Sequence, residues 1–583
     1  MSRTRWQVAA SPAPEAVQLF PELDPLIVKL LWNRGLRDQQ SVDEFLLPDY
    51  GQDIHDPFLF RDMERACARV WRALADGEKI VVFGDYDADG VTGSAVLIST
   101  LRALALRLGK DAALIGSYIP HREHEGYGLR AAAVSSLADG GMKLLITVDC
   151  GIGSAAEIAL AKERGIDAIV VDHHHVPEKI PEAVILHPLA PGENYPFKSL
   201  AAVGVAFKFA SGLIAYAERQ GAGLEPGFQK WLLDLVAIAT VTDFMPLIGE
   251  NRTLEKYGLI VLNKTRRPGL RRLIEIAGLK SGQIDTVSVG YQIGPRLNAA
   301  SRMEHGSLAL ETLLAENAER ADELAGRLQQ LNADRQKVTE TIVRAARITV
   351  GEQSGRKLQI VSGDGWPAGV VGLIAGKLAG ENGLPVFIFG KEGERYVGSG
   401  RGIPGFDLMA CLDRCKPYLS RYGGHTQACG VTIEGEDNYR AFCEAAEAYA
   451  REALAGRDLR PALDIDAVLG LGQITWDLLD WLAKFEPFGE GNQRPKFLLR
   501  DLLVTSLYPV GKDGKHVRIG VRGDSAREMK MIGFNLAPQA SGLLPGSVID
   551  AVVELGVNVW NGSRSIQLKV LDWRPVGVEE SKV

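Results

Sequence analysis

The stretch "VVFGDYDADGVTG", from Val81 to Gly93, places an apolar run directly before three carboxylates, Asp85, Asp87 and Asp89. The run is short and rich in β-branched residues, which is typical of a buried strand. Carboxylates this close together repel one another, and the repulsion costs free energy unless a positive charge lies among them. The stretch therefore predicts a strand that ends at a site for a cation.

Apolar runs and helical patterns alternate around this stretch. Short runs at 79–83, 113–120, 143–148 and 167–171 read as strands, and residues 91–109 and 154–165 read as helices. Apolar strands separated by helices are typical of βαβ units with a buried parallel sheet. We therefore expect a parallel α/β domain in this part of the chain.

The length and composition indicate a soluble protein of several domains. A chain of 583 residues is too long for one core and suggests about three to five domains. It contains no apolar run of about 18 residues, and its first residues lack the apolar stretch of a signal peptide. Its six scattered cysteines indicate reduced thiols, so we expect a cytoplasmic protein. The net charge of −7 argues against a protein that coats nucleic acid in bulk, but it leaves room for a locally basic groove.

The rest of the chain suggests three further regions. Residues 305–350 follow a 3-4 apolar spacing interrupted at Arg335, and we read them as one long helix that bridges two lobes; a short coiled coil is the alternative. A second α/β unit follows at about 356–450. From about 462, short alternating strands with glycine-rich turns favour a small barrel, with an OB-fold as the leading candidate. The first 50 residues are partly helical, and we assign them no function.

Four segments share one layout, an apolar run followed by residues that commonly bind metals. They are "VVFGDYDADG", "LLITVDCG", "AIVVDHHH" and "AIATVTDFMP", with the candidate residues Asp85, Asp87, Asp89, Asp149, Asp172, His173, His174, His175 and Asp243. In open parallel sheets, ligands bind beyond the carboxyl ends of the strands, so we expect these segments to converge. A single aspartate after a strand is more often a helix cap. Only the combination therefore points to a metal site.

Carboxylates and imidazoles without cysteine suit Mn²⁺ or Mg²⁺, and the histidines favour Mn²⁺. Two such ions about 4 Å apart activate a water and stabilise the attacking and leaving oxygens of a phosphoryl transfer. The sequence has neither a Ser–His–Asp nucleophile elbow nor a GxxxxGK[ST] loop. Metal-assisted phosphoester hydrolysis is therefore the chemistry that the residues predict.

These residues also resemble a known family. "DYDADG", "TVDCG", "DHH" and "TVTDFMPL" resemble, in order, the four motifs of the DHH phosphoesterase superfamily, and "GGHTQACG" (423–430) resembles the signature of its DHHA1 domain. "YQIGPRLNAASRM" (291–303), "GSGRGIPGFDL" (398–408), "PFGEGNQRPKF" (487–497) and the terminal strands with "GKHVRI" and "NVWNG" are similar to those of the RecJ exonucleases. The resemblance covers nearly the whole chain beyond about residue 45.

The resemblance implies a role for each matching residue. The implied metal ligands are Asp87, Asp89, Asp149, His173 and Asp243, with Asp85 and Asp172 either as ligands or as residues that orient them. His174 would face the scissile phosphate. The implied contacts to the 5′-terminal phosphate and the DNA are Arg122, Arg302, Ser399, Arg401 and His425. Arginine suits this task because its guanidinium group grips phosphate with two hydrogen bonds.

The resemblance further implies a fold and an activity. We expect two α/β lobes, DHH and DHHA1, bridged by a long helix and followed by an all-β, OB-fold-like barrel. The expected segments are 1–50, DHH 51–304, helix 305–350, DHHA1 351–455, barrel 456–575 and tail 576–583. The implied activity is 5′→3′ hydrolysis of single-stranded DNA in DNA repair and recombination, with two divalent cations, Mn²⁺ or Mg²⁺. A single-strand-binding protein and a helicase are implied partners of a monomeric enzyme.

Two positions depart from the motifs, and one pair of cysteines has two readings. Gly402 stands where relatives are expected to have Ser, and Ser301 stands where Gly is common, so the phosphate pocket is assigned less firmly than the metal ligands. Cys411 and Cys415 lie one helical turn apart near Cys429. They allow a zinc site, but we prefer buried thiols because zinc pairs commonly have other spacings.

Basic residues would have to line the path of DNA to an acidic site. "KTRRPGLRR" (264–272) is one such cluster, although a solvated charged face is the ordinary reading. The barrel offers a second set, with Phe497 and Trp560 as candidate stacking surfaces: Lys512, Lys515, His516, Arg518 and Arg522. A narrow channel between the two lobes would admit a single strand and exclude a duplex.

Two other functions fit parts of this sequence. One is a DHH phosphodiesterase for short oligonucleotides or cyclic dinucleotides, which would not need the terminal barrel. The other is a non-catalytic DNA-binding scaffold on a decayed core, which should have lost ligands that this chain retains.

Overall fold

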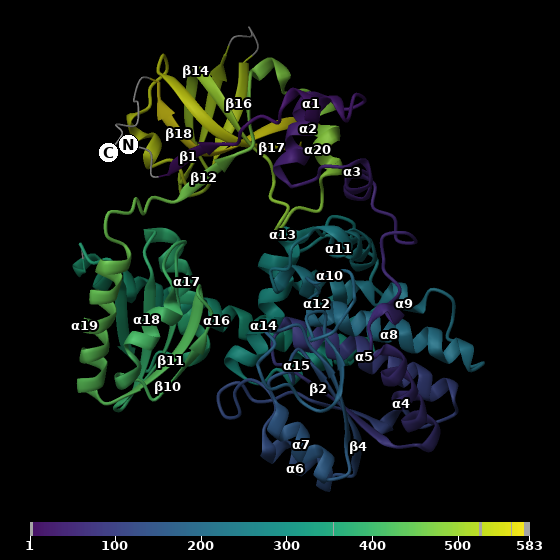
Figure 1. Cartoon of the computed structure of the whole chain (residues 1–583). Helices are drawn as coiled ribbons and strands as arrows, with labels where there is room; N and C mark the ends of the chain where they lie inside the picture. Colours follow the sequence, from purple (N-terminus) through teal and green to yellow (C-terminus); the bar gives the residue numbers. More distant parts are fainter. Residues whose placement is uncertain (1–3, 354, 524–527, 561, 577–583) are drawn as a thin grey trace. The chain divides into compact units, whose positions relative to one another are not determined.

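The computed structural model describes residues 4–353, 355–523, 528–560 and 562–576. The chain forms two compact units (Figure 1). One comprises Ile54–Met245 and Thr253–Leu459, and contains both α/β lobes. The other comprises Met1–Asp53, Pro246–Arg252 and Arg460–Val583. The two units are described separately below.

The first lobe is built on a parallel sheet with the strand order β3-β2-β4-β5-β6. The strands are β2 (Lys79–Gly84), β3 (Ile115–Tyr118), β4 (Met142–Val148), β5 (Asp167–Val171) and β6 (Val184–Leu186). Because the chain runs from β2 outward to β3 and then returns to β4 on the other side, the order reverses between β2 and β4. Ligands of open α/β sheets bind at such a point.

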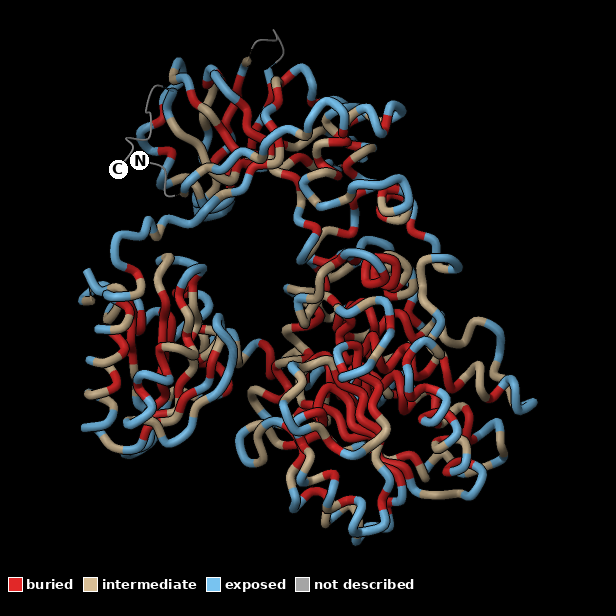
Figure 2. Tube along the Cα trace, viewed as in Figure 1, coloured by how far each residue is buried: buried red, intermediate tan, exposed pale blue. Residues whose placement is uncertain are grey.

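Helices cover both faces of this sheet, so its inner strands β2 and β4 are almost entirely buried (Figure 2). The helices α6 (Ala131–Asp139) and α7 (Ala155–Glu163) form an apolar cluster with one face. Contacts to the strands also come from α4 (Met63–Asp76), α5 (Ala88–Arg107) and α8 (Ala202–Arg219). By length and composition α5 could cross a membrane, but 78% of its apolar window is buried in the fold. It is therefore a core helix.

Further helices complete the first lobe and lead away from it. In chain order they are η1 (Pro57–Leu59), η2 (Ala112–Leu114), α9 (Phe228–Trp231), α10 (Leu233–Thr242), α11 (Gly249–Leu262), α12 (Pro268–Ile276), α13 (Thr286–Ser288), the π-helical turn η3 (Val289–Ile293), α14 (Gly294–Met303) and α15 (Ser307–Leu314). The largely apolar α10 packs against α5 and α8. This packing brings the end of α10 to the sheet.

The single helix predicted over 305–350 is wrong at its start. The structure has α15 and then α16 (Ala318–Glu352), with a break at residues 315–317. Asn317 causes the break, because its side chain accepts a hydrogen bond from the Arg320 backbone N–H and so caps a new helix. Helix α16 packs first on α12 and α14 and then on the second lobe, so it bridges the lobes as predicted (Figure 1).

The second lobe has a mixed sheet with the order β10-β11-β9-β8-β7, in which only β7 and β8 are parallel. Its strands are β7 (Gln359–Asp364), β8 (Val386–Glu392), β9 (Arg395–Arg401), β10 (Arg421–Gly424) and β11 (Ala428–Glu434). One face packs on α16 and α17 (Ala368–Asn382), and the other on α18 (Leu408–Arg414), η4 (Lys416–Tyr418) and α19 (Glu436–Ala453). Cys411 and Cys415 are buried, free thiols in the second of these cores.

The other unit contains a closed barrel. Its strands β14 (Lys496–Val510), β15 (His516–Arg522), β16 (Glu528–Gly533), β18 (Ser563–Pro575) and β17 (Val548–Trp560) form a ring that closes between β17 and β14. Around it lie β1 (Arg5–Val8), α1 (Pro14–Gln18), α2 (Pro25–Asn33), α3 (Gln39–Leu46), β12 (Ala462–Ile465), β13 (Ala467–Leu469), η5 (Leu471–Gln473), α20 (Trp476–Lys484) and η6 (Gln539–Gly542). The N-terminal helices share one core with the barrel. The predicted barrel is confirmed.

Candidate metal centre and phosphate pocket

Three aspartates form a row at the carboxyl edge of the first sheet. Asp85, Asp149 and Asp172 are the first residues after β2, β4 and β5. Each continues the ladder, because its backbone N–H donates to the last residue of the next strand: Val148 at 3.1 Å, Val171 at 3.0 Å and Leu186 at 3.2 Å. Asp149 has a φ of 63°, a backbone conformation that costs free energy and is common at functional sites.

The loop after β2 turns straight into α5. The Asp87 side chain caps this helix by accepting hydrogen bonds from the backbone N–H groups of Asp89 and Gly90. Gly90 is required here, since a Cβ atom would lie 2.4 Å from the Asp85 carbonyl oxygen. Both Asp89 oxygens accept hydrogen bonds at 2.8 Å from the start of α8. This double contact fixes the Asp89 carboxylate.

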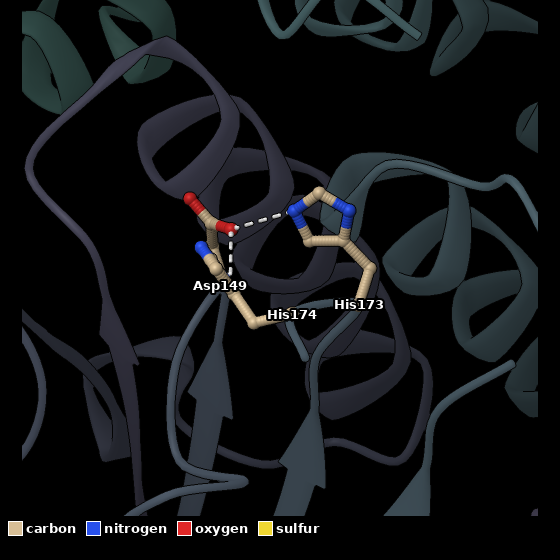
Figure 3. Close-up of side chains that lie close together, drawn as sticks. All are labelled: Asp149, His173 and His174. Carbon is tan, nitrogen blue, oxygen red and sulfur yellow. Dashed lines mark ion pairs between the residues drawn. The ribbon is translucent and has the colours of Figure 1, made fainter. Parts of the chain in front are cut away.

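His173 lies among carboxylates that come from three other segments. Its Nε2 atom is 3.3 Å from Asp149 Oδ1, 3.6 Å from Asp89 Oδ2 and 3.6 Å from Asp243 Oδ2. Figure 3 shows the Asp149 carboxylate facing the rings of His173 and His174. Asp243 directly follows α10. All four segments identified in the sequence therefore supply side chains to one place.

The carboxylates of this centre are strongly perturbed. Burial, with added repulsion from Asp87, raises the pKa of Asp89 to about 7 and that of Asp85 well above its ordinary value. Burial and the charge of Asp89 raise the pKa of Asp243 to about 8 and that of Asp149 far above normal. The buried Oδ1 atoms of Asp85 and Asp149 make no hydrogen bond. The cluster is therefore unfavourable as a set of bare anions.

The same donors suit divalent cations. Three groups each bring their ligand atoms within 4.8 Å of one another: Asp149, His173 and His174; Asp89, His173 and Asp243; and Asp85, Asp87 and Asp149. These groups share members, as expected of two adjacent ions. The donors are carboxylate oxygens and imidazole nitrogens only, which fits Mn²⁺ and Mg²⁺. Among the described residues, no such group contains a cysteine.

Both carboxylate oxygens of Asp172 accept hydrogen bonds within the protein. Its Oδ2 accepts from the Ile152 backbone N–H at 3.0 Å, and its Oδ1 accepts from the backbone N–H groups of His173 and His174. Oδ1 also lies 2.9 Å from His174 Nδ1. Although burial raises the pKa of Asp172, the hydrogen bonds and charge of His174 bring it down to about 2. The environment of Asp172 thus favours its ionised form, which lies within hydrogen-bonding distance of His174.

Tyr127 is a neighbour that the sequence did not reveal. Its hydroxyl donates to the Asp149 carbonyl oxygen at 3.2 Å and lies 3.1 Å from His174 Nδ1. Burial lowers the pKa of His174, but Asp172 raises it to about 9. Tyr127 follows Arg122 in the same loop, "HREHEGYG", and that proximity is the only sequence signal that could have found it.

The predicted phosphate residues form a cluster of arginines. Arg122 stacks on the Tyr86 ring at 4.7 Å, and Arg302 donates to the Gly369 carbonyl oxygen at 2.8 Å. Arg401 donates to Ser399 Oγ at 2.8 Å. Burial and the neighbouring positive charges, Arg122 first, lower the pKa of Arg302 to about 9. Such mutual repulsion favours binding of an anion.

His425 is placed differently. It is exposed in the turn between β10 and β11, where its backbone N–H donates to the Ala428 carbonyl oxygen at 2.8 Å. Within the described ranges its ring makes no hydrogen bond or ion pair. His425 is therefore not a buried residue of its turn, and its role at the site stays a prediction.

The 264–272 cluster is partly used within the fold. Arg266 stacks on Trp231 at 3.6 Å, Arg267 pairs with Asp234 at 3.4 Å, and Arg272 pairs with Asp322 at 2.6 Å. These pairs reduce the charge that the segment can offer to DNA. The cluster fits its ordinary reading, a charged face, at least as well as a DNA contact.

The barrel surface corrects one prediction. Phe497 is fully buried in the barrel core, so it offers no stacking surface, and the Trp560 side chain lies outside the described part of the chain. Tyr508 is 60% exposed and pairs across β14 and β15 with exposed Arg518. The remaining basic side chains are exposed apart from half-buried His516, which packs on Phe534: Lys512, Lys515, His516 and Arg522.

Comparison with known proteins identifies the family. Three family models match the chain: the DHH family N-terminal domain at residues 79–240, the DHHA1 domain at 355–452 and the RecJ OB domain at 465–572. The chain is 36% identical to the single-stranded-DNA-specific exonuclease RecJ of Bacillus subtilis (strain 168), over 98% of the chain and 71% of that protein.

Two solved structures extend the comparison to the fold. RecJ of Thermus thermophilus in complex with Mn²⁺ matches with a TM-score of 0.82 and 30% identity, over 98% of this chain and 80% of that one. The complex with Mg²⁺ matches with a TM-score of 0.76 and 28% identity, over 98% and 78%. Fold and site thus define a phosphoesterase of the DHH superfamily. Within it, the chain belongs to the RecJ family of single-stranded-DNA-specific exonucleases, as the motifs predicted.

Proposed function

We propose that this chain is a divalent-metal-dependent exonuclease that hydrolyses the phosphodiester bonds of single-stranded DNA from the 5′ end, in DNA repair and recombination. One observation carries this proposal above all: His173 Nε2 lies within 3.6 Å of carboxylates from three separate segments. Uncompensated buried charges of this kind are strongly destabilising. Their retention is explained by a catalytic metal centre.

The cofactors that fit are two divalent cations, Mn²⁺ or Mg²⁺. The residues that would hold them are Asp87, Asp89, Asp149, His173 and Asp243, with Asp85 as a further donor. When bound, the ions activate a water and stabilise the attacking and leaving oxygens of the phosphoryl transfer. Asp89 is held in place by the start of α8, and the Asp149 backbone by its strand ladder, so both residues are positioned by contacts within the fold.

His174 is the residue that we assign to the scissile phosphate. Asp172 and Tyr127 both lie at its Nδ1 atom, and no described residue makes a hydrogen bond to Nε2, which we assign to a substrate oxygen. Asp172 keeps its charge and stabilises a protonated imidazole, so His174 can donate a hydrogen bond to the phosphate. Hydrogen bonds to an ionised group are stronger than those between neutral groups.

The arginine cluster gives a reason for the 5′ polarity. A terminal phosphate carries about two negative charges, whereas an internal phosphodiester carries one. Arg122, Arg302 and Arg401, with Ser399 Oγ bound to Arg401, are suited to the more highly charged group. We propose that they hold the 5′-terminal phosphate, and that exposed His425 contacts the strand nearby.

The barrel is suited to hold the strand outside the catalytic centre. OB-folds bind single strands through basic grooves and aromatic stacking. Tyr508, Arg518 and Arg522 supply these groups on β14 and β15. A phosphodiesterase for short oligonucleotides or cyclic dinucleotides remains the competing proposal, and it assigns no task to this surface.

Substrate length separates the two proposals. The experiment compares kcat/KM for a long 5′-phosphorylated single strand, a blunt duplex of the same sequence and a dinucleotide, all with Mn²⁺. We expect the long single strand to be degraded at least about tenfold more efficiently than either competitor. Preference for the dinucleotide would favour the competing function, and equal cleavage of the duplex would remove the narrow-channel explanation of strand selectivity.

Location and partners follow from weaker observations. All six cysteines are free thiols, which supports a reducing, cytoplasmic environment. The family resemblance supports a monomeric enzyme that works with a single-strand-binding protein and a helicase. Pull-down of these two proteins and sedimentation of the purified chain test this assignment.

A further inference from the structure

Arg335 is a charged residue in the apolar stripe of the long helix α16. Its Nε atom is buried and has no hydrogen-bond partner. In the part of the chain that the structure describes, its guanidinium group makes no ion pair. Arginines that only join helices normally bind carbonyl oxygens or carboxylates. The role of Arg335 is therefore not explained by its contacts within the fold.

Two neighbours on α16 have the same property. Asn332 Oδ1 and Thr339 Oγ1 are also buried atoms without a hydrogen-bond partner, and Asn332 is only 1% exposed. Positions 332, 335 and 339 are three and four residues apart, so they share one face of the helix. Buried polar atoms are nearly always hydrogen-bonded. The unpartnered Arg335 N–H and Thr339 hydroxyl can donate hydrogen bonds to a group that the chain itself does not supply, whereas Asn332 Oδ1 can only accept one.

The positive charges near Arg335 favour an anion as that group. Helix α16 packs against α14, which carries Arg296 and Arg302. Arg296 already donates to Gln329 Oε1 at 2.9 Å and Arg302 to the Gly369 carbonyl oxygen at 2.8 Å. Burial and the charge of Arg296 lower the pKa of Arg335, and the charge of Arg335 in turn lowers the pKa of Arg302. Positive charge therefore accumulates on both helices.

This accumulation is continuous with the phosphate pocket. Arg302 also lies in the field of Arg122 and Arg401, which are the predicted 5′-phosphate residues. Bringing four guanidinium groups together is unfavourable unless negative charge lies among them. Arg302 donates to the Gly369 carbonyl oxygen, whereas Arg335 makes no hydrogen bond or ion pair with the described residues.

We infer that Arg335 is a fourth arginine of this pocket and binds a DNA phosphate, with Asn332 and Thr339 as neutral neighbours on the same helix face. The inference rests on the proposed function, since it assumes that Arg302 and Arg401 bind DNA. The phosphate is either the terminal monoester or an adjacent internal diester. Both present the oxygen acceptors that a guanidinium fork recognises.

The test measures binding and catalysis in Arg335→Ala, Arg335→Lys and the size-preserving Arg335→Gln. Arg344→Ala is the matched control, because Arg344 is an exposed arginine on the same helix. Affinity for a fluorescent single strand is measured without divalent metal over a range of salt concentrations, and KM and kcat are measured with Mn²⁺. Each strand is used with a 5′-phosphate and with a 5′-hydroxyl.

We expect Arg335→Ala and Arg335→Gln to bind about tenfold more weakly, and KM to rise with kcat nearly unchanged. The slope of log K against log salt should become shallower by about 0.7, the value for one phosphate contact on a single strand. Arg335→Lys should recover part of the affinity, and Arg344→Ala should match the parent. A loss confined to the 5′-phosphorylated strand assigns Arg335 to the terminal phosphate, and an equal loss on both strands assigns it to an internal one.

Unchanged affinity and salt slope in Arg335→Gln, together with a clear loss in Arg401→Ala, would overturn this inference alone. No loss in either variant would instead overturn the proposed phosphate pocket. If Arg335→Ala does not fold, Arg335→Gln and Arg335→Lys give the same comparison.

Discussion

The Nε2 atom of His173 lies 3.3 Å from Asp149 Oδ1, although the two residues follow different strands, β5 and β4. The parallel sheet produces this proximity, because adjacent strands end at the same edge. The strained φ of 63° at Asp149 turns its side chain into the centre. Asp149 belongs to two of the three candidate ligand groups, and a role as shared ligand of two cations would explain why this geometry is maintained.

Asp149→Asn is the first test of that relationship. Asparagine keeps the shape of the side chain but removes its charge, so we expect metal affinity to fall and nuclease activity to drop at least about 1000-fold. Isothermal titration with Mn²⁺ and a nuclease assay measure the two effects. Asp167→Asn, at an exposed aspartate at the other end of β5, is the control. Wild-type activity in Asp149→Asn would exclude Asp149 as a metal ligand.

Asp172→Asn should separate the orientation of the His174 ring from metal binding. Asp172 holds His174 Nδ1 at 2.9 Å but appears in none of the three candidate ligand groups. We expect kcat to fall about 100-fold, as for loss of a general acid or its orienting partner. Mn²⁺ affinity should fall by less than about tenfold, at the low end for residues that orient ligands. Loss of Mn²⁺ binding as severe as in Asp149→Asn would contradict this division.

The raised carboxyl pKa values predict a pH-dependent effect of metal on stability. The pKa of Asp89 is raised from 3.8 to about 7, and that of Asp243 to about 8, so the folded metal-free protein holds these protons more tightly than the unfolded chain. That contribution to stability is complete below the unfolded pKa and is lost as the pH rises through 7 to 8. Metal binding, in contrast, strengthens as the protons leave.

We therefore expect the increase in Tm on adding Mn²⁺ to grow between about pH 6 and pH 8. Thermal unfolding with and without the ion, at several pH values in this range, provides the measurement. The Asp89→Asn variant should show a smaller dependence. An increase in Tm that is the same at each pH would show that these carboxyls are already ionised in the metal-free protein.

The barrel surface predicts a length-dependent binding defect. Tyr508 and Arg518 face each other across β14 and β15, and stacking of one base on an aromatic ring contributes about 1–3 kcal/mol. Tyr508→Ala should therefore weaken binding of a long single strand at least about fivefold, while cleavage of a very short oligonucleotide should change little. Leu544→Ala, at another exposed apolar side chain of this unit, is the control. An equal defect on both substrates would exclude a strand-holding role.

The hydrogen bonds of Arg252 are expected to stabilise the unit that contains the barrel. Its buried guanidinium donates to five backbone carbonyl groups: those of Phe45, Lys484, Phe485, Glu486 and Pro487. Hydrogen bonds from a charged donor contribute about 1.5–3 kcal/mol each, and their removal leaves buried acceptors unpaired. Arg252→Ala should destabilise this unit by at least about 3 kcal/mol in chemical unfolding. A change below about 0.5 kcal/mol, as expected for exposed Arg500→Ala, would contradict this role.

Much of the catalytic lobe is predictable from sequence because its signals are local. The β-branched runs before Asp85, Asp149 and Asp172 define the strands, and parallel topology places their ends together. The motif resemblance then gives the family. The role of Asp172 is not predictable in this way. It depends on the Ile152 backbone N–H, which no sequence pattern places 3.0 Å from its carboxylate.

The remaining misses also have physical causes. Asn317 begins a new helix although the apolar spacing continues past it, because a capping side chain can replace the helical bonds of one turn. Phe497 lies in the core, and its burial was not predicted because strand alternation alone does not say which side of a barrel strand faces inward. Tyr127 acts through a contact between two loops, which depends on the folded geometry.

The most direct test of the central claim is hydrolysis of a 5′-phosphorylated single strand that is labelled at one end. With Mn²⁺, a 5′ label should be released as mononucleotide from the first turnovers, whereas a 3′ label should remain on progressively shorter strands. Asp149→Asn should show neither product. Early release of a 3′-terminal nucleotide, internal cleavage, or full activity in the presence of a chelator would contradict the account.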